Sequence, residues 1–396
     1  MNLMYATKNI KVLLAISFAI LLSCTAIART ITPGTTVEVE RIAKDKKAQK
    51  TDLNYESTPL IVNVLYRYPS SLYNPVSPDG ASNANIKWEQ CKADRWFIEE
   101  QRYAEERIIA GLLKNDSQAI QSGFKMFDWG FARQSSDGSF KGTGDPFHST
   151  SFFVQAVART LLVLQQSPQA SKYAYRIARY KPLVRRAARW MILPSVWKKG
   201  IERNEPYAHR RYLVAAALGL TGKLTGDRQL IDRARQSIKD GLSLQSLDGG
   251  NPEKGGYDTS YQMVGVVYAQ RWVTYFPDDL LTPKVKAMIN KALAWEQARI
   301  SNAGEISSRG NTRTGGEEKS RAGRTKDVSS RIVLRGFAYW GAVTGDSKWS
   351  AIARKIANYY HSPHPHSDRT KLHFNSLVSI RICNKRYVRQ AYRSRI

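Results

Sequence analysis

Apolar and polar positions follow one another along most of this chain in a pattern that predicts paired helices. Stretches rich in small and apolar residues, which predict buried helices, run from Ser149 to Leu164, Tyr207 to Leu220, Thr259 to Tyr275 and Val328 to Val343. Each is followed by an amphipathic stretch with basic outer positions, in Lys172 to Met191 with a kink or break expected at Pro182, Arg228 to Leu242, Lys284 to Arg299 and Lys348 to Tyr360. A buried helix paired repeatedly with an amphipathic one predicts an inner and an outer ring of helices.

Polar loops separate the pairs and recur along the sequence. They open at Gln134, Lys198, Gln245 and Gln297, so the repeat is roughly 50 to 60 residues long. A further pair predicted between Ala93 and Ala132 brings the total to at least five hairpins. We therefore expect an all-α fold, an open or closed (α/α) toroid of about five to seven hairpins, with the loops gathered at one end of the inner ring.

The two ends of the chain differ from this repeat. Residues 1–28 combine Lys8 and Lys11 with the apolar run from Val12 to Leu22 and a small-residue site at Ala28, which predicts a signal peptide and a periplasmic or secreted protein. The same region permits a lipid anchor at Cys24. No later stretch approaches the roughly 18 apolar residues of a membrane span.

The remaining sequence divides into three parts. Residues 29–87 are rich in proline and strand-like only from Leu60 to Tyr66, which predicts an extended arm. Residues 88–370 form the toroid domain, and 371–396 form a basic tail to which the pattern assigns no structure. Cys91 and Cys383 either pair or stay free, and we expect no cofactor and no metal, because no metal-ligand spacing surrounds either cysteine.

The charge balance narrows the class of partner. The chain has 61 Lys and Arg against 33 Asp and Glu, a net charge of +28, which predicts attraction to polyanions unless the whole proteome is basic. Nucleic acid, anionic lipid and acidic glycan all have the required sign, and export makes nucleic acid the least suitable. We therefore expect an acidic polysaccharide as partner, and the sequence leaves the oligomeric state open.

The loops before the inner helices supply the candidate chemistry, because in such a ring the helix starts converge. His148 precedes the first helix, Asn204 and His209 flank the start of the second, and Gln134 opens the first loop. Capping and satisfied burial are the ordinary explanations for these side chains. Asn and His beside Tyr and Arg nevertheless favour a site.

Two further loops carry aromatic and basic side chains. Tyr257, Asp258 and Tyr261 have spacings of three and four residues, which share one face of a helix. A loop flanked by glycines contains Arg309, Asn311 and Arg313. A core aromatic pair and a solvated loop are the alternatives. A tyrosine on an inner ring needs a partner for its hydroxyl group, which favours a functional role.

These tyrosine, Asn-plus-His and Arg-bearing loops, on helical hairpins behind a signal peptide, resemble the (α/α)-toroid polysaccharide lyases, including the alginate and glucuronan lyases of polysaccharide lyase family 38. The resemblance spans about Trp88 to Tyr360, although Asn204 lies five residues before His209 where one group of alginate lyases has Asn-Asn-His. It implies β-elimination from a uronic acid without a cofactor, and it implies that a histidine is the base for some substrate epimers.

Such a reaction removes the proton at C5, next to a carboxylate whose charge must be neutralised. Arg313, Asn311 and His209 suit that task, and Tyr261, with Tyr257 second, suits the role of base and acid because a nearby cation favours the phenolate. His148, Asn204, Asp258, Arg309 and Gln134 are expected to bind substrate.

Two other functions are compatible with the same residues. A glycoside hydrolase on the same ring needs two carboxyl groups, which Asp145, Glu205 and Asp258 could supply. A non-catalytic binder of acidic glycan needs only the basic surface.

Overall fold

The computed structural model describes residues 50–67, 75–91, 95–316, 318–319 and 325–361, and the backbone of two short strands. These residues, Lys50 apart, belong to one compact unit that begins at Thr51. The predicted signal peptide 1–28, with Cys24, lies outside the described residues. Cys91 forms a disulfide, and the two other cysteines, Cys24 and Cys383, lie outside the described residues.

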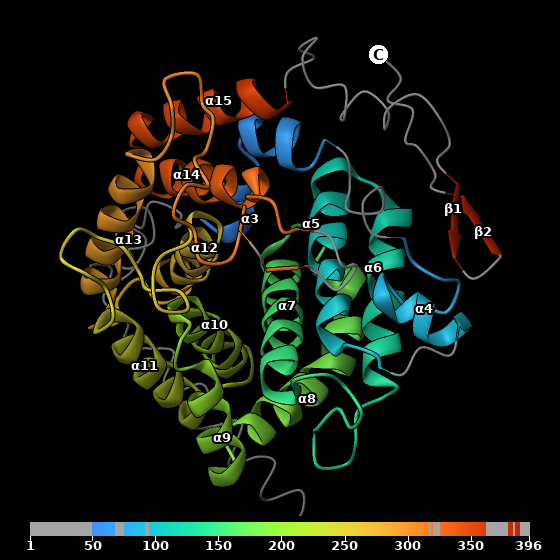
Figure 1. Ribbon diagram of the computed structural model, residues 1–396. Helices are drawn as coiled ribbons and strands as arrows, with labels where there is room; N and C mark the ends of the chain where they lie inside the picture. The colour runs from blue at the N-terminus through green and yellow to red at the C-terminus, as the bar shows by residue number, and fades with distance from the viewer. Residues whose placement is uncertain are drawn as a thin grey trace, which may run out of the picture. The chain divides into compact units, whose positions relative to one another are not determined.

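Five helical hairpins form an incomplete ring in the described part of the chain (Figure 1). The inner helices are α5 (Ala104–Lys114), α7 (Pro146–Gln166), α10 (Ala208–Thr225), α12 (Thr259–Tyr275) and α14 (Ser330–Thr344). The outer helices are α6 (Ser117–Phe131), α8 (Ala174–Met191), α11 (Arg228–Leu242), α13 (Thr282–Gln297) and α15 (Ser347–His361). Each inner helix packs against its outer partner and against the next inner helix. The expected (α/α) toroid is thereby confirmed.

Shorter elements complete the architecture. They are α3 (Asp52–Glu56), a π-helical turn η1 (Ile61–Leu65), α4 (Ala84–Cys91), the 3-10 helices η3 (Ile98–Tyr103) and η4 (Ser171–Tyr173), and α9 (Pro194–Asn204). The strands β1 (Ser379–Ile382) and β2 (Lys385–Val388) pair antiparallel within the predicted tail.

The two rings differ in how their side chains are buried, as the sequence pattern predicts. Along the outer helix α11, the residues Leu230, Ala234 and Ile238 recur every four positions and are fully buried, so one stripe faces the inner ring. The inner helix α7 is buried along most of its length, from Phe147 to Leu164. By length and composition it could span a membrane, contrary to our sequence reading, but 89% of its most apolar window is buried, as in a core helix.

Three local predictions are corrected by the structure. The strand-like run from Leu60 to Tyr66 is helical, with η1 packed against α14. The polar loop expected at Lys198 is part of α9, whose first residue Pro194 has the fixed φ that suits a helix start. Helix α8 continues through Pro182 without a break.

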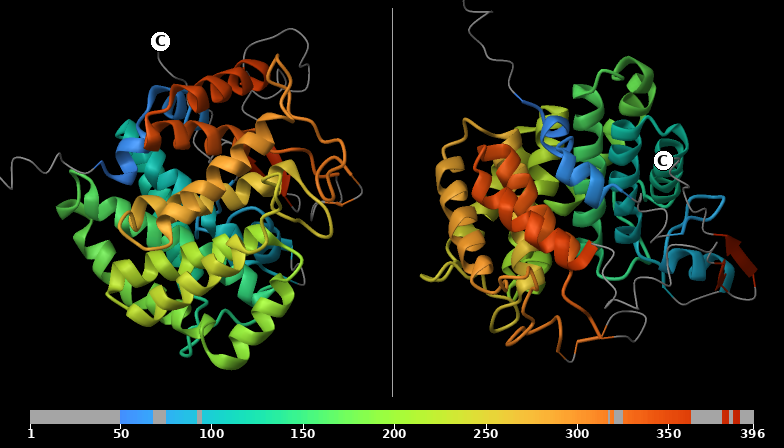
Figure 2. Two further views of the ribbon diagram at one scale, coloured as in Figure 1. Left: turned by 90° about the vertical axis from the view of Figure 1, so that its left-hand side faces the viewer. Right: turned by 90° about the horizontal axis from the view of Figure 1, so that it is seen from above.

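The N-terminal segment helps to close the ring from inside. Figure 2 shows α3 and η1 beside α14, and residues of this predicted arm are buried there. Arg159 of α7 donates to the carboxylates of Asp52 and Glu56 at 2.6–2.8 Å and to Glu105 of α5 at 2.5 Å. Arg335 of α14 donates to Glu56 at 2.9 Å. This buried network ties the segment to inner helices from both ends of the repeat.

Candidate functional site

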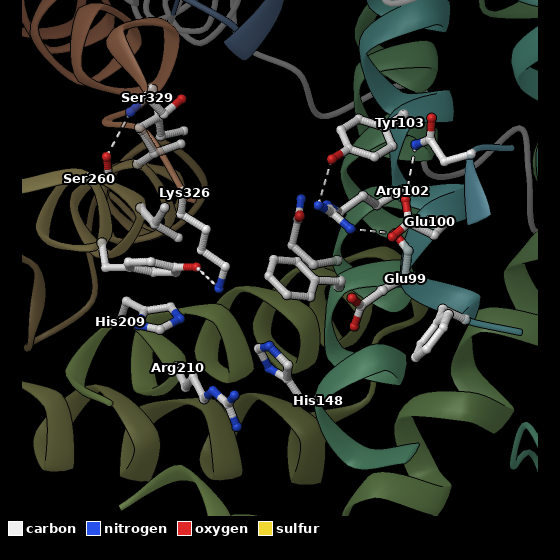
Figure 3. Close-up of a pocket in the computed structure, with 18 of the residues that line it drawn as sticks. Glu99, Glu100, Arg102, Tyr103, His148, His209, Arg210, Ser260, Lys326 and Ser329 are labelled. Carbon is white, nitrogen blue, oxygen red and sulfur yellow. Dashed lines mark hydrogen bonds between the residues drawn. The ribbon is translucent and has the colours of Figure 1, made fainter. Parts of the chain in front are cut away.

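A cavity of about 1310 Å³ opens among the starts of the inner helices and the loops before them. The first turns of α7, α10 and α12 contribute His148, His209 and Tyr261, and the floor reaches Arg159 and Arg335 of the buried network. Figure 3 shows His209, Arg210 and Lys326 on one side of this space and Glu99, Arg102 and Tyr103 on the other. Residues far apart in the sequence therefore meet in one cleft, as the ring predicts.

The cavity carries an excess of positive charge. Eleven lysines and arginines line it, against six aspartates and glutamates. Several of the cations are already paired with carboxylates, for example Arg335, which donates to Glu56 at 2.9 Å. Two of the cations, Arg313 and Lys326, lie beside Tyr261. A ligand with its own negative charge therefore suits this side of the cavity best.

His209 is held by a carboxylate that sequence reasoning missed. Its Nδ1 lies 2.7 Å from Oε1 of the buried Glu253, which also accepts the backbone N–H of His209 at 2.9 Å. Since an ionised carboxylate can only accept, Nδ1 carries the proton and Nε2 keeps a lone pair. Burial lowers the pKa of His209, outweighing the opposite effect of Glu253, and Arg313 and Arg210 lower it further. At neutral pH, His209 is a neutral imidazole that can accept a proton.

Tyr261 lies directly beside this histidine, with their ring centroids 4.9 Å apart. The Asp258 carboxylate caps α12 by accepting the N–H of Tyr261 at 3.0 Å, which fixes where the tyrosine leaves the helix. Lys326 donates to the phenol oxygen at 3.3 Å, and the guanidinium carbon of Arg313 lies 3.4 Å from the ring centroid. Two cations therefore stabilise negative charge that develops on this oxygen.

Arg313 and Lys326 share a third neighbour, Glu318. The Nε and Nη2 atoms of Arg313 donate to the two oxygens of Glu318 at 3.0 and 3.1 Å, and Lys326 donates to one of the same oxygens. Burial would raise the pKa of Glu318, but the bonds from Arg313 and Lys326 outweigh it and lower the pKa to about 2. This carboxylate is ionised throughout the working range of pH.

His148 contributes a second imidazole to the cavity. Its ring centroid lies 6.5 Å from that of His209, and its Nδ1 is buried without a hydrogen-bond partner in the described structure. Burial, together with Arg210 and His209, lowers the pKa of His148 well below its usual value. The wall between α7 and α10 therefore holds two neutral imidazoles.

The structure brings Tyr261, His209, Arg313 and His148 together in this cavity and places the other predicted residues elsewhere. Tyr257 and Arg309 line a separate pocket of about 630 Å³, where the Tyr257 hydroxyl donates to the Arg309 carbonyl at 3.1 Å. Tyr257 precedes the helix cap, so the helical spacing that was expected to join it to Tyr261 does not apply.

The remaining predicted binding residues hold loops in place. The fully buried Asp258 accepts N–H groups from Tyr261, Arg313 and Thr314. Asn311 bonds Thr259 and Thr314, while the buried Asn204 accepts from Tyr207 and Arg210. None of the three lines the cavity.

Gln134 also lies outside the cavity, and its role could have been found in the sequence. It donates to the carbonyls of Gly138 and Leu183, and Gln245 donates to those of Gly249 and Met288 in the equivalent loop. The shared Gln-Ser-x-Asp-Gly pattern is thus a structural feature of the repeat. No comparable sequence pattern points to Glu253, Glu318 or Lys326. Nothing in their spacing along the chain links them to His209 or Tyr261.

Comparison with known proteins gives a distant likeness in structure and none in sequence families. No protein-family model matches the chain, and no curated protein matches it. Among solved structures, a glycosyl hydrolase family 88 protein from Bacteroides vulgatus is similar, with 11% sequence identity, a TM-score of 0.48, and coverage of 86% of this chain and 93% of that chain. In the described residues, no group of three or more His, Cys, Asp or Glu is arranged to hold a metal ion. Neither the similar structure nor the lack of such a group among the described residues assigns a reaction or a substrate to this chain.

Proposed function

We propose that this protein is a polysaccharide lyase that cleaves an acidic polysaccharide, such as alginate or glucuronan, by β-elimination, and that it acts in the periplasm or outside the cell. The observation that carries the proposal is the pair of Tyr261 and the neutral His209, held next to Arg313 and Lys326 in one cavity. The export pattern of residues 1–28 supports the location.

Each group has a defined task in this reaction. Arg313 and Lys326 neutralise the carboxylate at C5, which makes the C5 proton more acidic. Nε2 of His209 takes that proton, and Glu253 stabilises the resulting imidazolium ion through Nδ1. The C4–C5 double bond forms as the C4–O bond breaks, and Tyr261 donates its phenol proton to the departing oxygen. Solvent then returns the proton from His209 to Tyr261.

This assignment differs from the one favoured by the sequence alone, where Tyr261 was the first choice for both base and acid. The role of base moves to His209, and the reason is the geometry of His209. Glu253 fixes its tautomer and leaves Nε2 unprotonated, whereas the Tyr261 oxygen accepts from Lys326 and its own O–H remains a donor.

A hydrolase is the second candidate, because carboxylates also line the cavity. Glu99 and Asp145 lie on its walls, the former accepting a hydrogen bond from Ser149 at 2.8 Å. Two of the three acids expected for a hydrolase are unsuitable, however. Asp258 is fully buried with both oxygens bonded, and Glu205 does not line the cavity.

One experiment separates these functions. The mature chain is incubated with alginate, glucuronan and hyaluronan, and the ultraviolet absorbance of the C4–C5 double bond is followed beside a reducing-end assay. A lyase gives both signals, and Tyr261→Phe and His209→Ala abolish both. Reducing ends without absorbance, lost in Glu99→Gln or Asp145→Asn, would establish the hydrolase instead. Binding without either signal would leave only a glycan-binding role.

A further inference from the structure

The cations beside Tyr261 already hold a carboxylate that belongs to the protein. Glu318 receives two parallel hydrogen bonds from Arg313, the fork-like arrangement by which arginine recognises carboxylates. Lys326 donates to the same group, and Lys254 lies 3.6 Å from it. Among the described residues, three cations therefore surround one carboxylate, and two of them, Arg313 and Lys326, line the cavity.

This pairing occupies two of the five N–H donors of Arg313. Its Nε and Nη2 are occupied by Glu318, and Nη1 has no hydrogen bond in the described structure and lies 3.7 Å from Glu253. The Arg313 side chain is only 8% exposed, whereas that of Glu318 is 20% exposed. Of the two partners, Glu318 is therefore the one that solvent or a ligand reaches more readily.

We propose that Glu318 occupies the place of the substrate's carboxylate, and that an acidic sugar binds by displacing it from Arg313 and Lys326. The inference rests on the proposed function, since that function gives these two cations the task of holding the C5 carboxylate. When no sugar is bound, Glu318 keeps Arg313 and Lys326 from being partly buried without a counter-charge. The affinity for the acidic sugar is lower as a result, because only the fraction of molecules with Glu318 displaced can bind it.

The test compares Glu318→Gln with the wild-type chain. Glutamine keeps the size of the side chain but removes its charge, so it competes weakly for Arg313 and Lys326. We expect D-glucuronate to bind about tenfold more tightly to the variant in calorimetry, corresponding to loss of one charge-assisted interaction. Binding of D-glucose should be the same in both proteins. The matched control is Glu202→Gln on α9, an exposed acid outside the cavity that should change neither affinity.

Turnover provides a second readout. With a polyuronate substrate, Glu318→Gln should lower KM about tenfold while kcat is maintained, because the cations remain beside Tyr261. Unchanged or weaker binding of D-glucuronate would refute displacement, and so would a fall in kcat without a fall in KM, which would make Glu318 a positioning residue. D-glucuronate has no glycosidic bond to cleave. The two proteins can therefore differ in D-glucuronate binding while the wild type degrades no polyuronate. That outcome would refute the lyase activity and leave the proposed displacement of Glu318 standing.

Discussion

Replacing Glu253 with glutamine is expected to slow catalysis while leaving the fold intact. The carboxylate holds Nδ1 of His209 at 2.7 Å and is fully buried, so water cannot substitute for it. A hydrogen bond to a charged group contributes about 2 to 3 kcal/mol, and this one strengthens as His209 becomes positively charged. If that contribution is lost only in the transition state, kcat falls about 30- to 150-fold.

The pH dependence of the variant gives an independent check. Glu253 raises the pKa of His209 against the stronger effect of burial, so its removal lowers that pKa further. A base with a lower pKa stays unprotonated to lower pH, and the acidic limb of the kcat profile moves downward even as its plateau falls. Initial rates from the double-bond absorbance, measured across the acidic range, show both effects.

Glu296→Gln is the matched control for this substitution. Glu296 is also fully buried, but burial raises its pKa well above the usual range, and it does not line the cavity. Its replacement should leave kcat and the pH profile unchanged. A Glu253→Gln protein that melts like the wild type and keeps more than half of its kcat would refute the role given to the pair.

Three further outcomes follow from the same contacts. Arg159→Met leaves three buried carboxylates without their shared cation and should lower the free energy of unfolding in urea by about 3 to 5 kcal/mol. The surface change Arg185→Ala should lower it by less than about 1 kcal/mol. Equal losses in the two variants would contradict the importance of the network. Burial holds the pKa of His148 low, so below about pH 6.5 the unfolded chain gains a proton that the folded chain refuses, and stability should fall by up to about 1.4 kcal/mol per pH unit until the folded pKa is reached. His148→Asn should flatten that slope, and an unchanged slope would count against the shift. Tyr257→Phe should leave the elimination rate intact, unlike Tyr261→Phe, because its hydroxyl serves only a loop carbonyl outside the cavity.

The helical repeat could be predicted because burial repeats along the sequence. The expected ranges for α11 and α12 agree with the structure, since the polar loops and caps around them mark both ends. Helix α9 was missed because its polar composition resembles a loop, although it starts at a proline suited to a first helical turn.

The site was predicted only where one local segment carries the information. His209 and Tyr261 stand in the first turns of inner helices, where a ring brings side chains together. Glu253 lies 44 residues from His209 and reaches it only through tertiary packing. Tyr257 was grouped with Tyr261 by helical spacing, but the backbone of Asp258, at φ −152°, is extended and turns Tyr257 toward another pocket.

The buried network at the floor of the ring has a consequence for the order of folding. Asp52 accepts a hydrogen bond from Tyr339, 287 residues later in the sequence, and Glu56 accepts from Arg335, 279 residues later. A growing chain makes the acids first and their last partners near the end, so these contacts cannot form until α14 has been synthesised. Contacts of such high sequence separation slow folding, and a nascent chain without α14 holds two carboxylates short of their partners. The innermost part of the ring is thus assembled last.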